Sequence, residues 1–148
     1  MAGRTALVPL TDIRDAIRRI ERYTAGKSLA AFRRDELVND AVERCLEIIS
    51  EASRRLSEEM KARHPDIPWR KVAGLGNVFR HEYDAVSTPL VWEIVREHLP
   101  PLKRAVSALI RNVRGKPNLE SDKRFRDRIG RARRSLRAGR GVKLEDVK

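Results

Sequence analysis

The sequence has little of what several protein classes require. It contains one cysteine in 148 residues, so no internal disulfide can form, and Cys45 lies among apolar residues as a reduced core thiol would. No apolar run approaches the roughly 20 residues of a membrane-spanning helix. The opening MAGRTALVPL also lacks the apolar stretch of a signal peptide. We therefore expect a soluble, cytoplasmic protein.

Patterns for binding metals and nucleotides are missing as well. The histidines and acidic residues show no metal-ligand spacing, and there is no glycine-rich phosphate loop, so no cofactor is expected. Aromatic residues make up only 5% of the chain, while 8 glycines and 7 prolines are modest numbers. Such a composition fits neither a collagen-like nor a wholly disordered chain.

Positive charge is plentiful but unevenly distributed. The formal net charge is +12. Residues 1–110 hold 19 Lys+Arg and 16 Asp+Glu, a net of +3, whereas residues 111–148 hold 14 and 5, a net of +9. An argument from basicity to nucleic acid therefore concerns mainly the last quarter of the chain.

Apolar residues recur at helical spacing along most of the chain, and no convincing strand alternation precedes Val142. The predicted helices cover about residues 11–26, 28–35, 35–63, 66–86, 88–113 and 122–138. The expected fold is all-α: an antiparallel four-helix bundle with a basic C-terminal helical appendage. The corresponding domains are the bundle at 10–113, a linker at 114–121 and a basic extension at 122–148.

Local signals predict how these helices begin, end and bend. Thr11 and Thr88 are suited to be N-caps, and Pro89 then takes the first helical position. The adjacent Pro100 and Pro101 must kink or briefly interrupt the last bundle helix. Gly74 and Gly76 are costly inside a helix, which suggests close approach of another backbone or a local break.

The stretch GNVFRHEY, residues 76–83, concentrates polar chemistry in the glycine-bearing helix. His81 can exchange a proton near neutral pH, and Asn77, four residues earlier, lies about 40° from it around a helix. Arg80 lies about 100° from His81 but has a long reach, and its guanidinium can hold a phosphate. Together they suit metal-free cleavage of a phosphodiester. The alternative is a solvated helix face.

The other two histidines are weaker candidates for such chemistry. His64 is next to Pro65 at a helix end, where a capping role is favoured. His98 precedes the proline pair and is expected to point to solvent.

Four blocks of the sequence resemble successive segments of the HepT-like family. They are AIRRIERYTAGKSLAAF, DAVERCLEIISEASRRL, PDIPWRKVAGLGNVFRHEYDAV and VWEIVREHLPPLKRAV, and together they span roughly residues 11–110. This family comprises small helical toxins of the HEPN superfamily, which are paired with a minimal nucleotidyltransferase (MNT-type) antitoxin. The resemblance implies a homodimeric bundle with a ribonuclease site between its subunits. It also implies neutralisation by AMP transfer onto a tyrosine beside the catalytic histidine.

The family motif maps onto this helix with one departure. It consists of an arginine, usually followed by asparagine, then a histidine five positions after the arginine, one variable residue and a tyrosine. Asn77, His81 and Tyr83 match, but Gly76 occupies the arginine position. Tyr83 is thus the implied AMP acceptor. The departure leaves open an alternative function, a catalytically weakened or inactive dimeric interaction module.

If the site is active, the resemblance implies a role for each residue. His81 acts as general base or acid on the ribose 2′-hydroxyl or the leaving oxygen, and Asn77 orients the histidine or the phosphate. Arg80, from either subunit, neutralises phosphate charge. Arg70 or Lys71 could reach the site only if the helix bends at its glycines.

The basic extension has two interpretations. Its arginines could contact nucleic-acid phosphates, and the candidates are Arg131, Arg133, Arg134 and Arg137. The alternative is an amphipathic helix whose charges keep it hydrated.

Overall fold

The structure is a computed structural model that describes residues 2–81, 88–115 and 130–131, and of residues 2–4 and 78–81 it describes the backbone alone. The chain divides into two units, Met1–Val113 and Arg114–Lys148. Nearly all described residues belong to the first unit. The second contributes the end of the last bundle helix and the helical pair Gly130-Arg131.

The described residues form helices joined by short turns, and no strand occurs among them, which confirms the all-α class. In chain order the elements are α1 (Ala2–Thr24), α2 (Leu29–Arg34), α3 (Glu36–Arg54), α4 (Glu58–Ala62), α5 (Trp69–His81), α6 (Thr88–Glu93), the π-helical segment η1 (Ile94–His98) and α7 (Leu99–Gly115). The four-helix count and the predicted domain boundaries stay predictions. Within the described part of the chain, no helix combines the length and apolar character needed to cross a bilayer.

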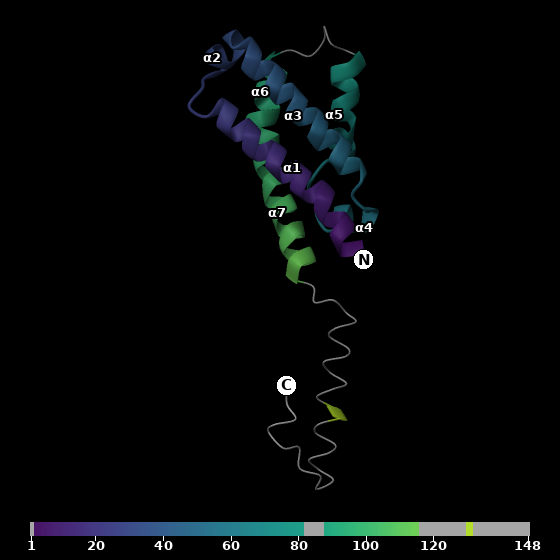
Figure 1. Ribbon diagram of the computed structural model, residues 1–148. Helices are drawn as coiled ribbons and strands as arrows, with labels where there is room; N and C mark the ends of the chain where they lie inside the picture. The colour runs from purple at the N-terminus through teal and green to yellow at the C-terminus, as the bar shows by residue number, and fades with distance from the viewer. Residues whose placement is uncertain (1, 82–87, 116–129, 132–148) are drawn as a thin grey trace, which may run out of the picture. The chain divides into compact units, whose positions relative to one another are not determined.

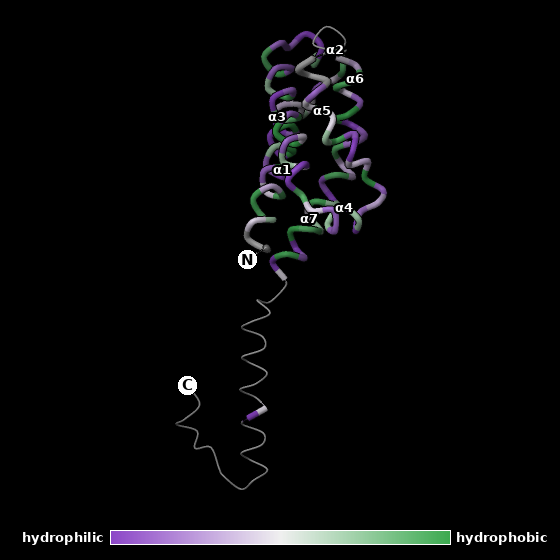
Figure 2. The backbone as a smooth tube through the Cα atoms, turned by 90° about the vertical axis from the view of Figure 1, so that its right-hand side faces the viewer, coloured by the Kyte–Doolittle hydropathy of each residue, from purple (hydrophilic) through white to green (hydrophobic). Residues whose placement is uncertain are grey.

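Helix α3 is central to the packing, because α1 lies along one side of it and α5 along another (Figure 1). Hydrophobic and hydrophilic residues follow one another along the helices (Figure 2), and the buried hydrophobic residues form one core cluster. Fully buried side chains of this core come from α1 to α3 and from α6 and α7; they include Ile13, Phe32, Leu46, Val91 and Leu109. Cys45 is also buried and free, as predicted.

Helix α1 begins earlier than the sequence predicted. Thr11 is not an N-cap but an interior residue, and its hydroxyl donates to the Leu7 carbonyl at 2.6 Å. The helix includes Pro9, which lies within its first eight residues and has no N–H to donate. Its end agrees with the prediction, because Gly26 has a positive φ of 71° just beyond Thr24.

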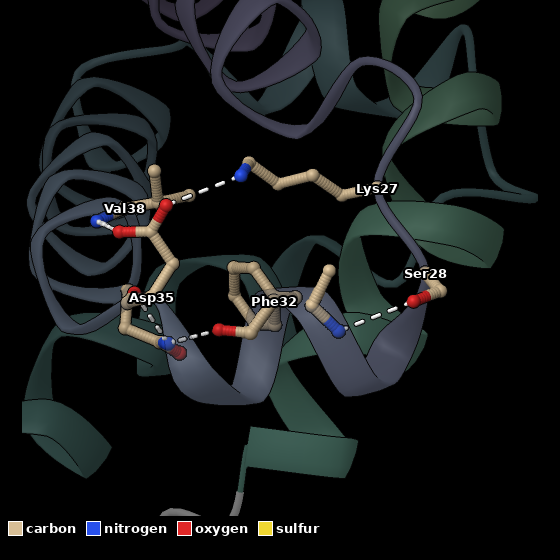
Figure 3. Close-up of polar contacts among 7 residues, drawn as sticks. Lys27, Ser28, Phe32, Asp35 and Val38 are labelled. Atoms are coloured by element: carbon tan, nitrogen blue, oxygen red, sulfur yellow. Dashed lines mark hydrogen bonds and ion pairs between the residues drawn. The ribbon is translucent and has the colours of Figure 1, made fainter.

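Two caps fix the connection from α1 through α2 to α3 (Figure 3). The Ser28 hydroxyl accepts the Ala31 N–H at the start of α2. Asp35 caps α3 by accepting the Val38 N–H at 3.1 Å, and its second oxygen binds the Lys27 ammonium at 3.1 Å. The backbone hydrogen bond and then the lysine hold the pKa of Asp35 below its usual value.

The long helix predicted for about 35–63 is divided in two. Helix α3 ends at Arg54, and α4 begins at Glu58. The reason is a second cap, Ser57, whose hydroxyl accepts the Met60 N–H at 3.2 Å. The apolar stripe alone did not reveal this break, because it continues in register through buried Leu56.

The proline pair interrupts the last bundle helix, as predicted, and the interruption takes the form of η1. Neither Pro100 nor Pro101 can donate to a carbonyl four residues earlier, and their rings crowd those carbonyls. The helix widens before them, and the Leu99 N–H bonds the Ile94 carbonyl five residues back. At the other end, α6 starts at Thr88 itself, one residue before the predicted start.

Candidate active site on helix α5

The start of α5 is fixed by buried aromatic and aliphatic side chains. The Trp69 indole N–H donates to the carbonyls of Lys61 at 3.1 Å and His64 at 3.0 Å. Ile67 and Val72 are buried beside it. The α4–α5 corner is therefore tied to the core, and it sets the direction in which α5 carries its later residues.

Opposite faces of α5 have opposite character. Val72 and Gly76 are buried on the side toward α3, whereas Arg70 and Asn77 are exposed. His81 ends the helix, one turn after Asn77, and a regular helix places those two positions about 40° apart. The shared face predicted for Asn77 and His81 therefore agrees with the backbone.

The structure describes the other predicted site residues only in part. The side chains of Arg80 and His81 lie outside the described residues, and so does all of Tyr83. The predicted continuation of the helix to Val86 also falls there. Helix α5 runs through both glycines as one α-helix, so the bend that would bring Arg70 toward the site is not found in this segment.

Gly76 lies against α3 at a polar contact. Its N–H donates to the Ser50 hydroxyl at 2.9 Å, and a Cβ built on Gly76 would come within 3.1 Å of that oxygen. The sequence predicted the approach of another backbone, whereas the close neighbour of Gly76 is the Ser50 side chain. At Gly74 a Cβ would meet nothing within 4 Å, so no close approach occurs there.

The Ala73 carbonyl, one turn before Asn77, accepts three side-chain hydrogen bonds from α3. The Ser50 hydroxyl donates to it at 2.8 Å. Arg54 donates twice, from Nε at 3.1 Å and from Nη2 at 2.7 Å. Ser50 and Arg54 therefore join α3 to α5 immediately before the segment that carries Asn77 and His81. We call this group, Ser50, Arg54, Ala73 and Gly76, the α3–α5 clamp.

Arg54 was not among the site residues predicted from the sequence. A signal was present, since Ser50 and Arg54 are four residues apart and thus share a face of α3. That face could not be matched to the two glycines of α5 without knowing how the helices pair.

A second basic group lies on α1, away from the clamp. Arg18, Arg19 and Arg22, with Asp15, line a hollow of about 360 Å³. The Arg19 Nη2 lies 3.2 Å from the Cys45 sulfur, and this hydrogen bond raises the pKa of Arg19. In the described part of the chain, no group of three or more His, Cys, Asp or Glu side chains is placed to hold a metal ion.

The structure describes the remaining predicted residues to different extents. His98 is exposed on η1, as predicted. No described hydrogen bond tests the capping role of His64. In the extension, Arg131 is helical and exposed, while Arg133, Arg134 and Arg137 lie outside the described residues.

Comparison with known proteins assigns this arrangement to a family. Residues 13–109 match the HepT-like family, described as "Ribonuclease HepT-like". The chain belongs to this HepT-like family of the HEPN ribonucleases. The matched residues include all of α3 and α5, and therefore the clamp, Asn77 and His81.

Individual relatives agree with that assignment. A protein of Methanocaldococcus jannaschii named "Putative RNase" is 32% identical over 106 residues, which cover 72% of this chain and 97% of the relative. "Probable ribonuclease HepT" of Thermococcus cleftensis is 39% identical over 94 residues, which cover 64% of this chain and 86% of the relative. No solved structure was found to match the chain.

Proposed function

We propose that the protein is a ribonuclease toxin that cleaves RNA at His81 without a metal ion. The observation that carries the proposal is membership of the HepT-like family over residues 13–109, with asparagine and histidine retained at the end of α5. The exposed face of α5 before that end supports it, because a nuclease must offer its proton carrier to a large substrate. Asn77 is exposed there.

The proposed reaction needs one proton to be removed and one to be returned. His81 takes the proton of a ribose 2′-hydroxyl, whose oxygen attacks the adjacent phosphorus. The bond from phosphorus to the 5′ oxygen breaks, that oxygen takes a proton from water as it leaves, and the protonated His81 then returns its proton to water. A 2′,3′-cyclic phosphate and a 5′-hydroxyl result. Asn77 orients the imidazole or the phosphate, and Arg80 neutralises phosphate charge.

A histidine pair tests this assignment. His81→Ala should lower the rate of RNA cleavage by about 10²–10⁴-fold, the usual contribution of a general acid–base. His98→Ala is the matched control, because His98 is exposed on another element. Unchanged cleavage in the presence of EDTA supports the metal-free chemistry. A His81→Ala protein that degrades RNA as well as the wild type refutes the assignment.

The proposal extends to the assembly and its control. We infer a homodimer in the cytoplasm and an MNT-type nucleotidyltransferase antitoxin that transfers AMP to Tyr83. Family membership supports these partners. Expression of the protein alone should arrest growth, and co-expression of the nucleotidyltransferase should relieve the arrest and add the mass of an adenylyl group. A Tyr83→Phe protein that still gains this mass contradicts the acceptor assignment.

A second candidate function is favoured by Gly76. Because position 76 is a buried glycine against Ser50, no cation extends from it. A catalytically weakened interaction module would keep the dimer and its antitoxin while cleaving RNA little or not at all. Cleavage assays on the purified dimer distinguish the two functions.

The basic extension belongs to the same proposal. Arg131, Arg133, Arg134 and Arg137 are proposed to add phosphate contacts, which makes RNA binding strongly dependent on salt. Deletion of residues 115–148 should then weaken RNA binding while leaving the helical fold intact. Equal affinity and salt dependence in the truncated and full-length proteins would exclude this role.

A further inference from the structure

Arg54 is an arginine on the surface whose guanidinium is held in place by the backbone of the neighbouring helix. Its Nε and Nη2 both bind the Ala73 carbonyl, at 3.1 and 2.7 Å. A guanidinium has five N–H donors, so three remain for another acceptor. The part of the chain that the structure describes provides no further hydrogen-bond or ion-pair partner for them. Among the described residues, the Arg54 guanidinium is therefore held by the α5 backbone and keeps donors for another acceptor.

The clamp places this charge beside the exposed face of α5. Asn77 follows Ala73 by four residues, and His81 follows Asn77 by four, with about 6 Å along the axis for each four-residue step. Arg54 Nη2 also lies 3.9 Å from the point where a Cβ of residue 76 would stand. Arg54 therefore occupies, from α3, the space next to the position at which α5 itself carries no side chain.

We propose that Arg54 binds the RNA phosphate beside His81 and supplies from α3 a charge that position 76 does not. This inference rests on the ribonuclease function proposed above. The ligand is a phosphodiester oxygen of single-stranded RNA, for which the remaining guanidinium donors are suited. No proton moves to or from Arg54, whose role is to neutralise charge.

A purely structural role for Arg54 makes a different prediction. If the guanidinium only joined α3 to α5, lysine and glutamine should have similar effects, because each can donate a hydrogen bond to the Ala73 carbonyl. If its charge binds phosphate, lysine should retain most of the effect and glutamine should not. Arg54→Lys and Arg54→Gln therefore separate the two roles.

The chain provides a matched control in the next residue. Arg55 is also exposed, but its Nη2 binds Asp12 on α1 at 2.9 Å, away from α5. Arg55→Gln makes the same change in net charge at the same end of α3. Any general effect of charge on RNA binding is therefore common to both variants, and an effect specific to Arg54 must come from its position.

The experiment measures binding and cleavage with the full-length dimer. Binding uses a single-stranded RNA with 2′-O-methyl groups, which cannot be cleaved by 2′-oxygen attack, over a series of salt concentrations. Arg54→Gln should weaken binding about tenfold at low salt, the loss expected for one charge-assisted hydrogen bond. The slope of log affinity against log salt should become shallower by about 0.7, the value for one phosphate contact. Arg55→Gln should leave that slope unchanged.

Cleavage of unmodified RNA gives the second measurement. Arg54→Gln should lower kcat/KM by about 10²-fold, as when one donor to developing charge is removed, and Arg54→Lys should recover most of the loss. Circular dichroism melts should show that all variants are folded. Equal effects of Arg54→Gln and Arg55→Gln overturn the inference, as do equal losses in Arg54→Gln and Arg54→Lys. If the wild type cleaves no RNA, the proposed function fails, and the binding series still decides the role of Arg54.

Discussion

Alanine substitutions at the two glycines of α5 should have opposite effects on stability. Both residues are interior to the same helix, where alanine is favoured over glycine by about 1 kcal/mol. A Cβ at Gly74 meets nothing within 4 Å, so Gly74→Ala should stabilise the fold by about 0.5–1 kcal/mol. In a chain of this size the melting temperature should rise by about 2–4 °C.

Gly76→Ala should bring no such gain, because its Cβ would lie 3.1 Å from the Ser50 hydroxyl. That oxygen holds two hydrogen bonds, at 2.9 Å from the Gly76 N–H and at 2.8 Å to the Ala73 carbonyl. Each contributes about 1 kcal/mol, so a shift that lengthens both offsets the helix propensity of alanine. We expect a change between zero and about 1 kcal/mol of destabilisation.

A double-mutant cycle checks the cause of this difference. In a Ser50→Ala background the hydroxyl is gone, and the nearest remaining atom is the Ser50 Cβ at 3.6 Å, an ordinary contact distance. Gly76→Ala should there become stabilising, with a coupling of about 1 kcal/mol. Urea unfolding followed by circular dichroism measures all four proteins. Equal shifts for Gly74→Ala and Gly76→Ala, or an additive cycle, would refute the reasoning.

Two further predictions concern polar contacts of α3. Ser50→Ala should destabilise by about 2 kcal/mol, because it removes two hydrogen bonds between helices, from the Gly76 N–H and to the Ala73 carbonyl. Ser53→Ala should cost under about 0.5 kcal/mol, because the Ser53 hydroxyl bonds only a carbonyl of its own helix. Similar losses of urea stability in the two variants would contradict this. At the start of α3, Asp35 has a lowered pKa, so its stabilising effect is complete above the unfolded-state value of about 3.8 and is lost as pH falls through the folded-state value. Asp35→Asn should make the melting temperature depend less on pH in that acid range. Lys27→Met should have a smaller effect, because the hydrogen bond from the Val38 N–H is the larger cause of the lowered pKa of Asp35. If the pH profile of Asp35→Asn is unchanged, the Asp35 carboxylate is not the source of the pH dependence.

The presence of helices could be predicted from the sequence, because the buried apolar residues recur along the chain at helical spacing. The stripe of α3 around Leu46 and the Gly26 stop both agree with the structure. The ends of the helices were harder to predict, because they depend on which of several neighbouring polar residues caps the helix. Thr11 has the residue type of an N-cap but lies inside α1, whereas Ser57 was not predicted to be a cap and caps α4. A side-chain hydroxyl can bond forward to an amide or back to a carbonyl, and the sequence does not decide between them.

The polar face of α5 could be predicted for the same reason, since Asn77 and His81 are related by one turn of a single helix. Arg54 could not be found in this way. Its relation to Ala73 depends on how α3 and α5 are aligned along each other, and that alignment is set by the packing of both apolar stripes and by the turn between them. The spacing of residues in a motif predicts contacts within one helix, but it does not predict a contact between two helices.

The interpretation of Gly76 depends on whether α5 is considered alone or packed against α3. A glycine at a position where an arginine is expected counts as a lost charge when α5 is considered alone. In the folded chain the same glycine lets the Ser50 hydroxyl reach the α5 backbone, and it leaves Arg54 Nη2 only 3.9 Å from the vacant Cβ position. An arginine at position 76 would have to displace Ser50 and would set a second guanidinium beside that of Arg54, where two like charges repel. Gly76 and Arg54 are therefore one arrangement, in which the charge near the end of α5 comes from α3. Gly76→Arg should therefore not raise the rate of RNA cleavage in the wild-type protein. It should raise that rate only in a protein in which Arg54 and Ser50 have both been replaced by alanine.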